Sequence, residues 1–287
     1  MNFARGRSPR TALPAASRAL RPLLGALAMI LPACAAPSRL VAAELATDFT
    51  GARLDRGTWK TLDPVELTRP DPQGLTIQIT AAAGAVPSAG IAARFGLRGD
   101  FEITADFEIV EVPTPKSGFG AGATISLSSA DGQGASMQRV HFPDGKQAYV
   151  CHRATPQPDG TVKHTVEVVE TKALAGRMRA ARVGSELRYF AAEGGGGAFR
   201  ELRKAAFSNA DVRLLHLAAQ TGEAPNPVSI RWKKFEAQAD ELLDEQGKSA
   251  GDRRLVIWGG LGAAGVFVAG LVFLKRSARR SAPNRAP

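Results

Sequence analysis

The chain has 287 residues, 44% of them hydrophobic and 22% charged, and its formal net charge is +10. All 27 acidic residues lie between Glu44 and Asp252, and the same stretch holds 24 Lys and Arg, so it carries a net charge of −3. The positive excess therefore belongs to the two ends of the chain, and no nucleic-acid partner is indicated.

Residues 1–43 have the order of a secretory signal peptide. Arginines precede the apolar stretch Leu23–Leu31, and small residues follow it. Cleavage after Ala35 or after Ala43 fits this pattern. In an alternative interpretation, Cys34 ends a lipoprotein box and is lipidated.

Residues 44–239 alternate between apolar and polar side chains with a period of two. In the stretch 101–109, Phe, Ile and Ala alternate with Glu, Thr and Asp, which is typical of a strand with one buried and one solvated face. The same spacing recurs at 75–79, 119–127, 162–168 and 228–232, and Asp-Gly pairs and the run Gly194–Gly197 separate such stretches. Val212–Ala219 is apolar almost throughout, which predicts a central strand covered on both sides. We therefore predict one all-β domain, an antiparallel β-sandwich or jelly roll.

The C-terminal part predicts a membrane anchor. Residues 240–254 are rich in Asp, Glu, Gln, Gly and Lys, as in a solvated stalk. The next 20 residues, Leu255–Leu274, carry no charge and are long enough to cross a bilayer as one transmembrane helix. Basic residues are denser in the tail 275–287 than before the helix, so we expect the tail in the cytoplasm and the domain on the extracytoplasmic side of the cell membrane. Small residues four apart in the helix favour a homo-oligomer.

Strand patterns and turn glycines follow a particular order along the domain. They lie at Phe95–Ile103, Gly118–Gly122, Gly176–Arg179, Val183–Phe190, Phe199–Leu202 and Val228–Phe235. This order resembles the concanavalin A-like lectin/glucanase superfamily, and most closely its bacterial, laminin-G-like secreted domains of unknown function. The resemblance covers most of 44–239 and implies a concanavalin A-like fold. It also implies recognition of carbohydrate or protein, with hydrolysis of polysaccharides in a minority of members.

Hydrolysis of a glycosidic bond would require two suitably spaced carboxylates. Asp106 and Glu108 are the best pair, because side chains two residues apart on a strand share a face and lie about 6–7 Å apart. The related glucanases carry a tight Glu-x-Asp-x-x-Glu run, which residues 101–108 do not reproduce. This departure favours the alternative, an ordinary solvated strand face.

The sequence predicts no metal site and no cofactor. The histidines His141, His152, His164 and His216 occur singly, without the spacing of a zinc site. We interpret His164 and His216, which lie among apolar positions, as hydrogen-bonded core residues. The resemblance leaves calcium open, through Asp131, Asp144 and Asp159, but a following glycine explains each as a turn residue.

Cys151 is the one cysteine left after signal removal, so the core must stabilise the domain without an intramolecular disulfide. His152 follows it directly, but neighbours on a strand point to opposite faces and cannot pair as nucleophile and base. We therefore interpret Cys151 as a free structural thiol.

Ligand recognition would rely on aromatic rings, which offer an apolar face to a sugar. Candidates are Trp59, Phe142, Tyr149 and Tyr189, whereas Trp232 is expected to pack in the sandwich. Arg177 and Arg179 could contact an anionic polymer, or they are ordinary solvated side chains.

Together these features predict a membrane-anchored extracytoplasmic β-sandwich that recognises a glycan or an envelope protein without catalysis. A glycoside hydrolase or lyase that uses Asp106 and Glu108 is the first alternative. A structural envelope or adhesion component is the second.

Overall fold

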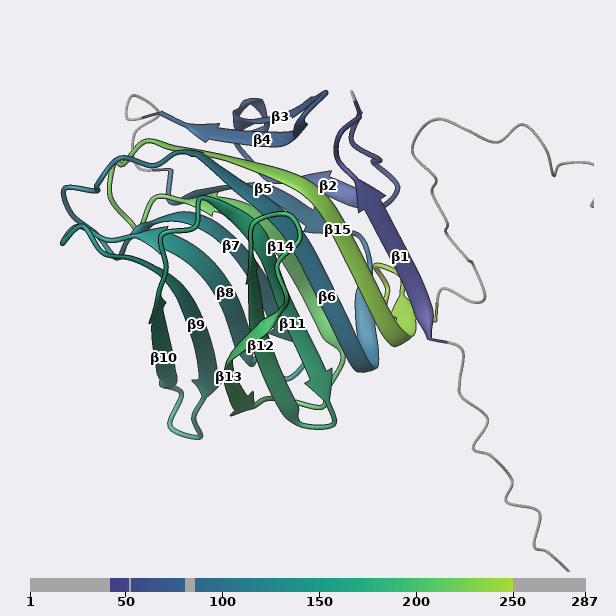
Figure 1. Ribbon diagram of the computed structural model, residues 1–287. Coiled ribbons are helices and arrows are strands. Elements are labelled where there is room, and N and C mark those ends of the chain that lie inside the picture. Colours follow the sequence, from purple (N-terminus) through teal and green to yellow (C-terminus); the bar gives the residue numbers. More distant parts are fainter. Residues whose placement is uncertain (1–41, 52, 81–85, 250–287) are drawn as a thin grey trace, which may run out of the picture. The chain divides into compact units, whose positions relative to one another are not determined.

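Antiparallel strands make up nearly all regular structure in residues 42–51, 53–80 and 86–249, the part of the chain that the computed structural model describes. One short 3-10 helix, Val65–Leu67, accompanies them. The strands form two layers, which lie one behind the other in Figure 1.

The first sheet is built around β14. In spatial order it contains β2 (Trp59–Thr61), β5 (Ser88–Ala93), β14 (Val212–Gln220), β7 (Ala121–Ser129), β8 (Gly134–His141), β9 (Gln147–Pro156) and β10 (Val162–Glu170). Within the described residues, β10 pairs only with β9 and is therefore an edge strand.

The second sheet is built around two long strands, β6 (Gly96–Glu111) and β15 (Val228–Leu243). Beyond β6 follow β11 (Ala175–Val183), β12 (Glu186–Glu193) and β13 (Arg200–Ala206). Beyond β15 lie β4 (Gly74–Ile79), with β3 (Thr68–Asp71) at its side, and β1 (Ala43–Asp48). A single register pair, Val212 with Leu97, connects β14 to β6 and so joins the two sheets.

The core lies between the layers and confirms the predicted alternation. Ile103 and Phe107 on β6 are at most 1% exposed, and so is Trp232 on β15. Trp59 packs edge-on against Phe235, with ring centroids 5.0 Å apart. Each fully buried side chain of this size contributes about 1.5–3 kcal/mol through the hydrophobic effect. An extensive apolar layer thus stabilises the domain, and the predicted antiparallel β-sandwich is confirmed.

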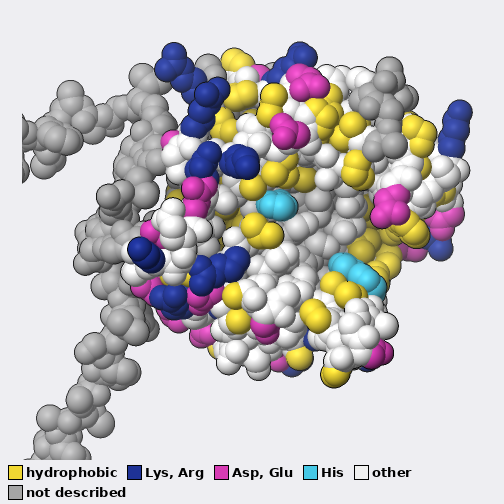
Figure 2. Space-filling view, turned by 180° about the vertical axis from the view of Figure 1, so that it is seen from behind, with side chains coloured by type: hydrophobic (Ala, Val, Ile, Leu, Met, Phe, Trp, Pro, Cys, Tyr) yellow, Lys and Arg dark blue, Asp and Glu magenta, His cyan; other side chains and the backbone are white. Residues whose placement is uncertain are grey.

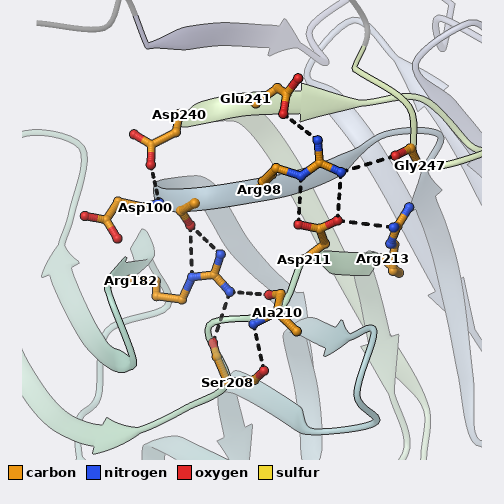
Figure 3. A network of polar contacts seen from close by, with 11 residues as sticks. Arg98, Asp100, Arg182, Ser208, Ala210, Asp211, Arg213, Asp240, Glu241 and Gly247 are labelled. Atoms are coloured by element: carbon orange, nitrogen blue, oxygen red, sulfur yellow. Dashed lines mark hydrogen bonds and ion pairs between the residues drawn. The ribbon is translucent and has the colours of Figure 1, made fainter.

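Two arginines secure the place where the sheets join (Figure 3). Arg182 is 1% exposed and donates hydrogen bonds to the carbonyls of Gly99, Ser208 and Ala210. The strand ladders stop here, and buried carbonyls without partners are costly, so the guanidinium takes the place of backbone donors. Above it, Arg98 pairs with Asp211 at 3.1 Å and with Glu241 at 2.6 Å.

The predicted stalk is wrong at its start. β15 continues to Leu243, four residues beyond the predicted end of the sandwich, and Leu242 and Leu243 are 7% and 0% exposed. Residues 244–249 turn back, so that Ser249 bridges to Leu243, and Glu245 pairs with Arg94 at 2.6 Å. The acidic composition misled the prediction because the arginines that hold these acids lie far away in the sequence.

Residues 1–41 of the predicted signal peptide, including Cys34, and the predicted helix Leu255–Leu274 and tail lie outside the described residues. Ala43, the last residue of the predicted signal peptide, is already the first residue of β1. In the described part of the chain, no helix has the length and apolar character needed to cross a membrane.

Candidate binding face

One surface of the sandwich carries almost no charge. We call it the open face: the outward side chains of β7, β8, β9 and β14. These four strands contain no Asp or Glu. A central row across them consists of His216, Ser126, Ser136 and His152, which are register partners. Figure 2 shows histidine side chains in cyan on this side of the molecule, beside a hollow, with acids and bases mainly toward the edges.

The floor of the open face is made of small side chains. Thr124, Ser136 and Ala218 point away from the core, yet they are only 4–8% exposed. Across the sheet, Thr124 lies between Ala218 on β14 and Gln138 on β8. Hydroxyl and amide groups on a shallow floor can donate to and accept from a polar ligand without the desolvation cost of an ion.

A pocket of about 270 Å³ lies at one end of this face. Phe119, Gln138, Gln220 and Glu223 are among its lining residues. The ring of Phe119 is 75% exposed, while Gln220 Nε2 donates to Gln138 Oε1 at 2.7 Å. An exposed ring beside two oriented amides is the kind of arrangement that binds a sugar, which needs an apolar contact and directed hydrogen bonds.

Glycines explain why Phe119 lies outside the core. The sequence pattern placed it as the first inward residue of a strand, but β7 begins only at Ala121. Gly118 and Gly120 have positive φ angles of 90° and 100°, so the chain leaves the strand conformation on both sides of Phe119. Its N–H donates to the carbonyl of Gly222 at 2.9 Å, which fixes the loop to the neighbouring one. The Gly-Phe-Gly sequence was the available signal for this residue.

Two histidines lie elsewhere than predicted. His164 and His216 were expected in the core, but both lie on the outer side of the first sheet, where Leu214 of β14 is 51% exposed. The apolar run in β14 therefore did not mean that both faces of this strand are covered.

Two histidines of the open face contact each other. His152 Nε2 lies 2.9 Å from His164 Nδ1, so one ring donates to the other. Burial, and secondly His164, lower the pKa of His152, and burial lowers that of His216.

For three of the four aromatic residues predicted to contact a ligand, the prediction is wrong because their side chains are buried. Trp59, Tyr149 and Tyr189 are 1%, 0% and 1% exposed, because their positions in the strands point inward and their large apolar rings fill the core. Trp59 Nε1 donates to Thr47 and Tyr189 Oη to the carbonyl of His152, so both polar groups are already used. Only Phe142 is at the surface, half-buried in the β8–β9 turn beside Gly120.

Arg177 and Arg179 lie on the outer face of the second sheet, away from the open face. Phe199 covers both guanidinium groups, whose central carbons are 4.5 and 3.8 Å from its ring centroid. Arg179 also pairs with Glu102 at 3.0 Å. These contacts within the chain occupy much of the surface that a polyanion would need.

Asp106 and Glu108 share the outer face of β6, as expected. Burial raises the pKa of Asp106, whereas hydrogen bonds from Lys233 and then Arg231 lower that of Glu108. Glu108 pairs with Lys233 at 2.9 Å and with Arg231 at 3.1 Å. Opposed pKa shifts suit an acid–base pair, but the carboxylate of Glu108 is engaged by two cations.

The described residues hold no group of three or more His, Cys, Asp or Glu arranged for a metal ion. Each aspartate that the resemblance left open for calcium accepts hydrogen bonds from within its own turn, and Asp131 also from a distant serine. Asp144 accepts from Lys146 N and Asp159 from Thr161 N, while Asp131 accepts from Ser129 and Ser208. Cys151 is free and buried, as predicted, and points inward while His152 points outward.

Several solved structures share the fold. The Crh5 transglycosylase in its apo form is 14% identical, with 73% of this chain and 92% of that chain covered and a TM-score of 0.52. An immunostimulatory antigen and pseudo beta-1,3-glucanase of Mycobacterium tuberculosis is 10% identical, with 68% and 98% covered and a TM-score of 0.51. An endo-acting O-glycanase from human gut microbiota is 12% identical, with 67% and 97% covered and a TM-score of 0.52. At such low identity these likenesses show the fold alone.

No curated protein matches the sequence. Residues 28–254, however, match a family model over most of the chain. With its concanavalin A-like sandwich, the chain belongs to the family described as "Protein of unknown function (DUF1583) C domain".

Proposed function

We propose that the sandwich recognises a glycan on the open face and does not cleave it. The observation that carries this proposal is the pocket at the end of that face, where the exposed ring of Phe119 stands beside the paired amides of Gln138 and Gln220. Aromatic faces and amide groups are the usual means of holding a sugar ring.

The composition of the strands that form the open face supports binding without cleavage. Glycoside hydrolysis usually needs an acid and a second carboxylate on either side of the scissile bond. β7, β8, β9 and β14 contain no Asp or Glu, and Glu223 is the one carboxylate among the residues that line the pocket. A sugar chain on this face would therefore be bound without its acid–base pair.

Binding of the full chain to a panel of polysaccharides and oligosaccharides tests the proposal. We expect Phe119→Ala to weaken binding about tenfold, consistent with the loss of one stacking contact. Val183→Ala is the matched control, because Val183 is a similarly exposed apolar residue, 62% exposed, on the second sheet. Equal binding by both variants, or no binding to any glycan by the unmodified chain, would refute the proposal.

The opposed pKa shifts of Asp106 and Glu108 favour a second candidate, a glycoside hydrolase or lyase on the outer face of the second sheet. Release of new sugar ends from a polysaccharide, abolished by Glu108→Gln but not by Phe119→Ala, would establish it in place of the first.

The location of this activity belongs to the same proposal. We place the sandwich outside the cytoplasm, released from a signal peptide at residues 1–43 and held at the cell membrane by Leu255–Leu274. Fractionation of the untagged full chain, with protease treatment of intact cells, tests this. Recovery of the chain in the cytosol would exclude this location.

Two further outcomes would change the proposed function. Glycan binding that disappears with a chelator and returns with calcium would add a calcium requirement. Adhesion without any glycan would favour a structural envelope component.

A further inference from the structure

The free edge of β10 has an unusual composition for an exposed strand. Val162, Val166 and Val168 are 48%, 52% and 50% exposed and alternate along one side of the strand. They lie on the outer side of the first sheet, because Val166 is the register partner of His152. At the edge of the second sheet, β13 instead carries Arg200, Glu201, Arg203 and Lys204. Charges protect an edge against pairing, whereas exposed valines favour it.

The backbone groups on this edge can be assigned from the hydrogen-bond ladder. Gln157 N donates to Thr161 O at one end of the β9–β10 pair, and Thr171 N donates to Gln147 O at the other. Because antiparallel pairs alternate between bonded and non-bonded residues, odd-numbered residues of β10 bond to β9. The N–H and C=O groups of Val162, His164, Val166 and Val168 therefore point to the open edge.

We infer that β10 pairs with β10 of a second copy of this chain across a two-fold axis at Thr165. In that register the sequence complements itself. Lys163 of each copy lies opposite Glu167 of the other, Val162 opposite Val168, and His164 opposite Val166. The outward-pointing backbone groups then form eight interchain hydrogen bonds, in four bonded pairs of residues.

Charge selects this register over its neighbours. With the axis at Val166, Lys163 would lie opposite Val169 and Glu167 opposite Thr165, so no charge would be paired. Lys163 has no ion-pair partner among the described residues. Glu167 pairs with Arg203 at 3.1 Å, yet its side chain is 52% exposed and free to accept a second cation. Opposite charges directly across a strand pair stabilise it, and like charges destabilise it.

Charge exchange tests this inference with the full chain in detergent solution. Sedimentation should show dimers for the unmodified chain, and at least tenfold weaker association for Lys163→Glu and for Glu167→Lys, since each places like charges opposite each other. A mixture of the two variants should associate again, because each pairs Glu with Lys in the heterodimer. Glu167→Lys also removes the contact with Arg203, so the recovery in the mixture separates loss of pairing from local damage.

A proline provides a second test that does not depend on charge. Val166→Pro removes an N–H that points away from β9, and an edge strand tolerates this change. It should abolish the dimer, while Val166→Thr, which keeps the N–H and suits a strand, should retain it. A monomeric unmodified chain would overturn the inference. So would an oligomer that withstands both charge reversals and the proline, because its contacts would then lie elsewhere in the chain.

Discussion

The two outer faces of the sandwich differ sharply in how they meet solvent. The second sheet presents ion pairs such as Arg179 with Glu102 and Arg231 with Glu108, at 3.0 and 3.1 Å. The open face of the first sheet presents hydroxyl, amide and imidazole groups. Exposed ion pairs contribute only about 0–1 kcal/mol each, so the charged face is chiefly a soluble surface. A broad face without charges does not favour solubility, which agrees with the ligand-binding role proposed for it.

The largest expected effect comes from placing the same charge on both faces. Thr124 and Thr104 point outward and are 5% and 4% exposed. Thr124→Asp would bury a carboxylate with no cation on the neighbouring positions, which should lower the free energy of unfolding by roughly 2–4 kcal/mol. Thr104→Asp should cost less, because Arg179 Nε already donates to Thr104 Oγ1 at 3.0 Å and offsets the like charge of Glu236, the register partner of Thr104 on β15. Urea unfolding of both variants measures the difference, and equal losses would contradict the contrast between the faces.

The second largest effect should be a loss of folding stability at low pH, caused by the histidines of the open face. The pKa values of His152 and His216 are lowered in the folded chain, so the unfolded chain takes up protons at a higher pH. Their contribution to stability is thus complete above the ordinary value of 6.5 and decreases as the pH falls toward the lowered values. Unfolding followed from about pH 7.5 to 5 should show this decline, and His216→Gln should reduce its slope.

A smaller effect on the free energy of unfolding is expected from Glu108→Gln, which lies on the charged outer face of the second sheet. Lys233 and then Arg231 lower the pKa of Glu108, so its stabilisation is present above the ordinary value of 4.5 and is lost as the pH falls through the lowered value. At neutral pH the substitution should cost less than about 1 kcal/mol, because the side chain is 32% exposed and screened. Below that range the variant and the unmodified chain should unfold alike. A larger loss at neutral pH would mean that the ion pairs stabilise more than a soluble surface does.

The smallest expected effect is a difference in thiol labelling between an inward and an outward position of β9. Burial raises the pKa of Cys151 to about 12, so a thiol reagent should leave this residue unlabelled in the folded chain. His152→Cys places a second thiol on the adjacent outward position of β9 and should be labelled rapidly under the same conditions. Labelling of Cys151 in the folded chain would show that β9 opens.

Local pattern predicted the fold well. Alternation with a period of two depends on neighbouring residues only, and Phe101, Ile103 and Phe107 are buried as their positions required. The predictions failed where burial depends on distant partners. Glu241 and Glu245 looked solvated because Arg98 and Arg94, which pair with them, lie 143 and 151 residues earlier in the sequence. Val212–Ala219 looked covered because an apolar run does not reveal whether a second layer lies above it.

The sequence by itself determined the all-β class, the inward and outward sides of most strands, and the free cysteine, since each follows from residue type and spacing. Only the tertiary structure decided which side of the sandwich is uncharged and where Phe119 lies. The open face joins strands from residues 121–156 with one from 212–220, and its pocket is completed by loops that glycines allow to meet. Sheet order and loop approach arise from contacts between distant segments, which no local pattern encodes.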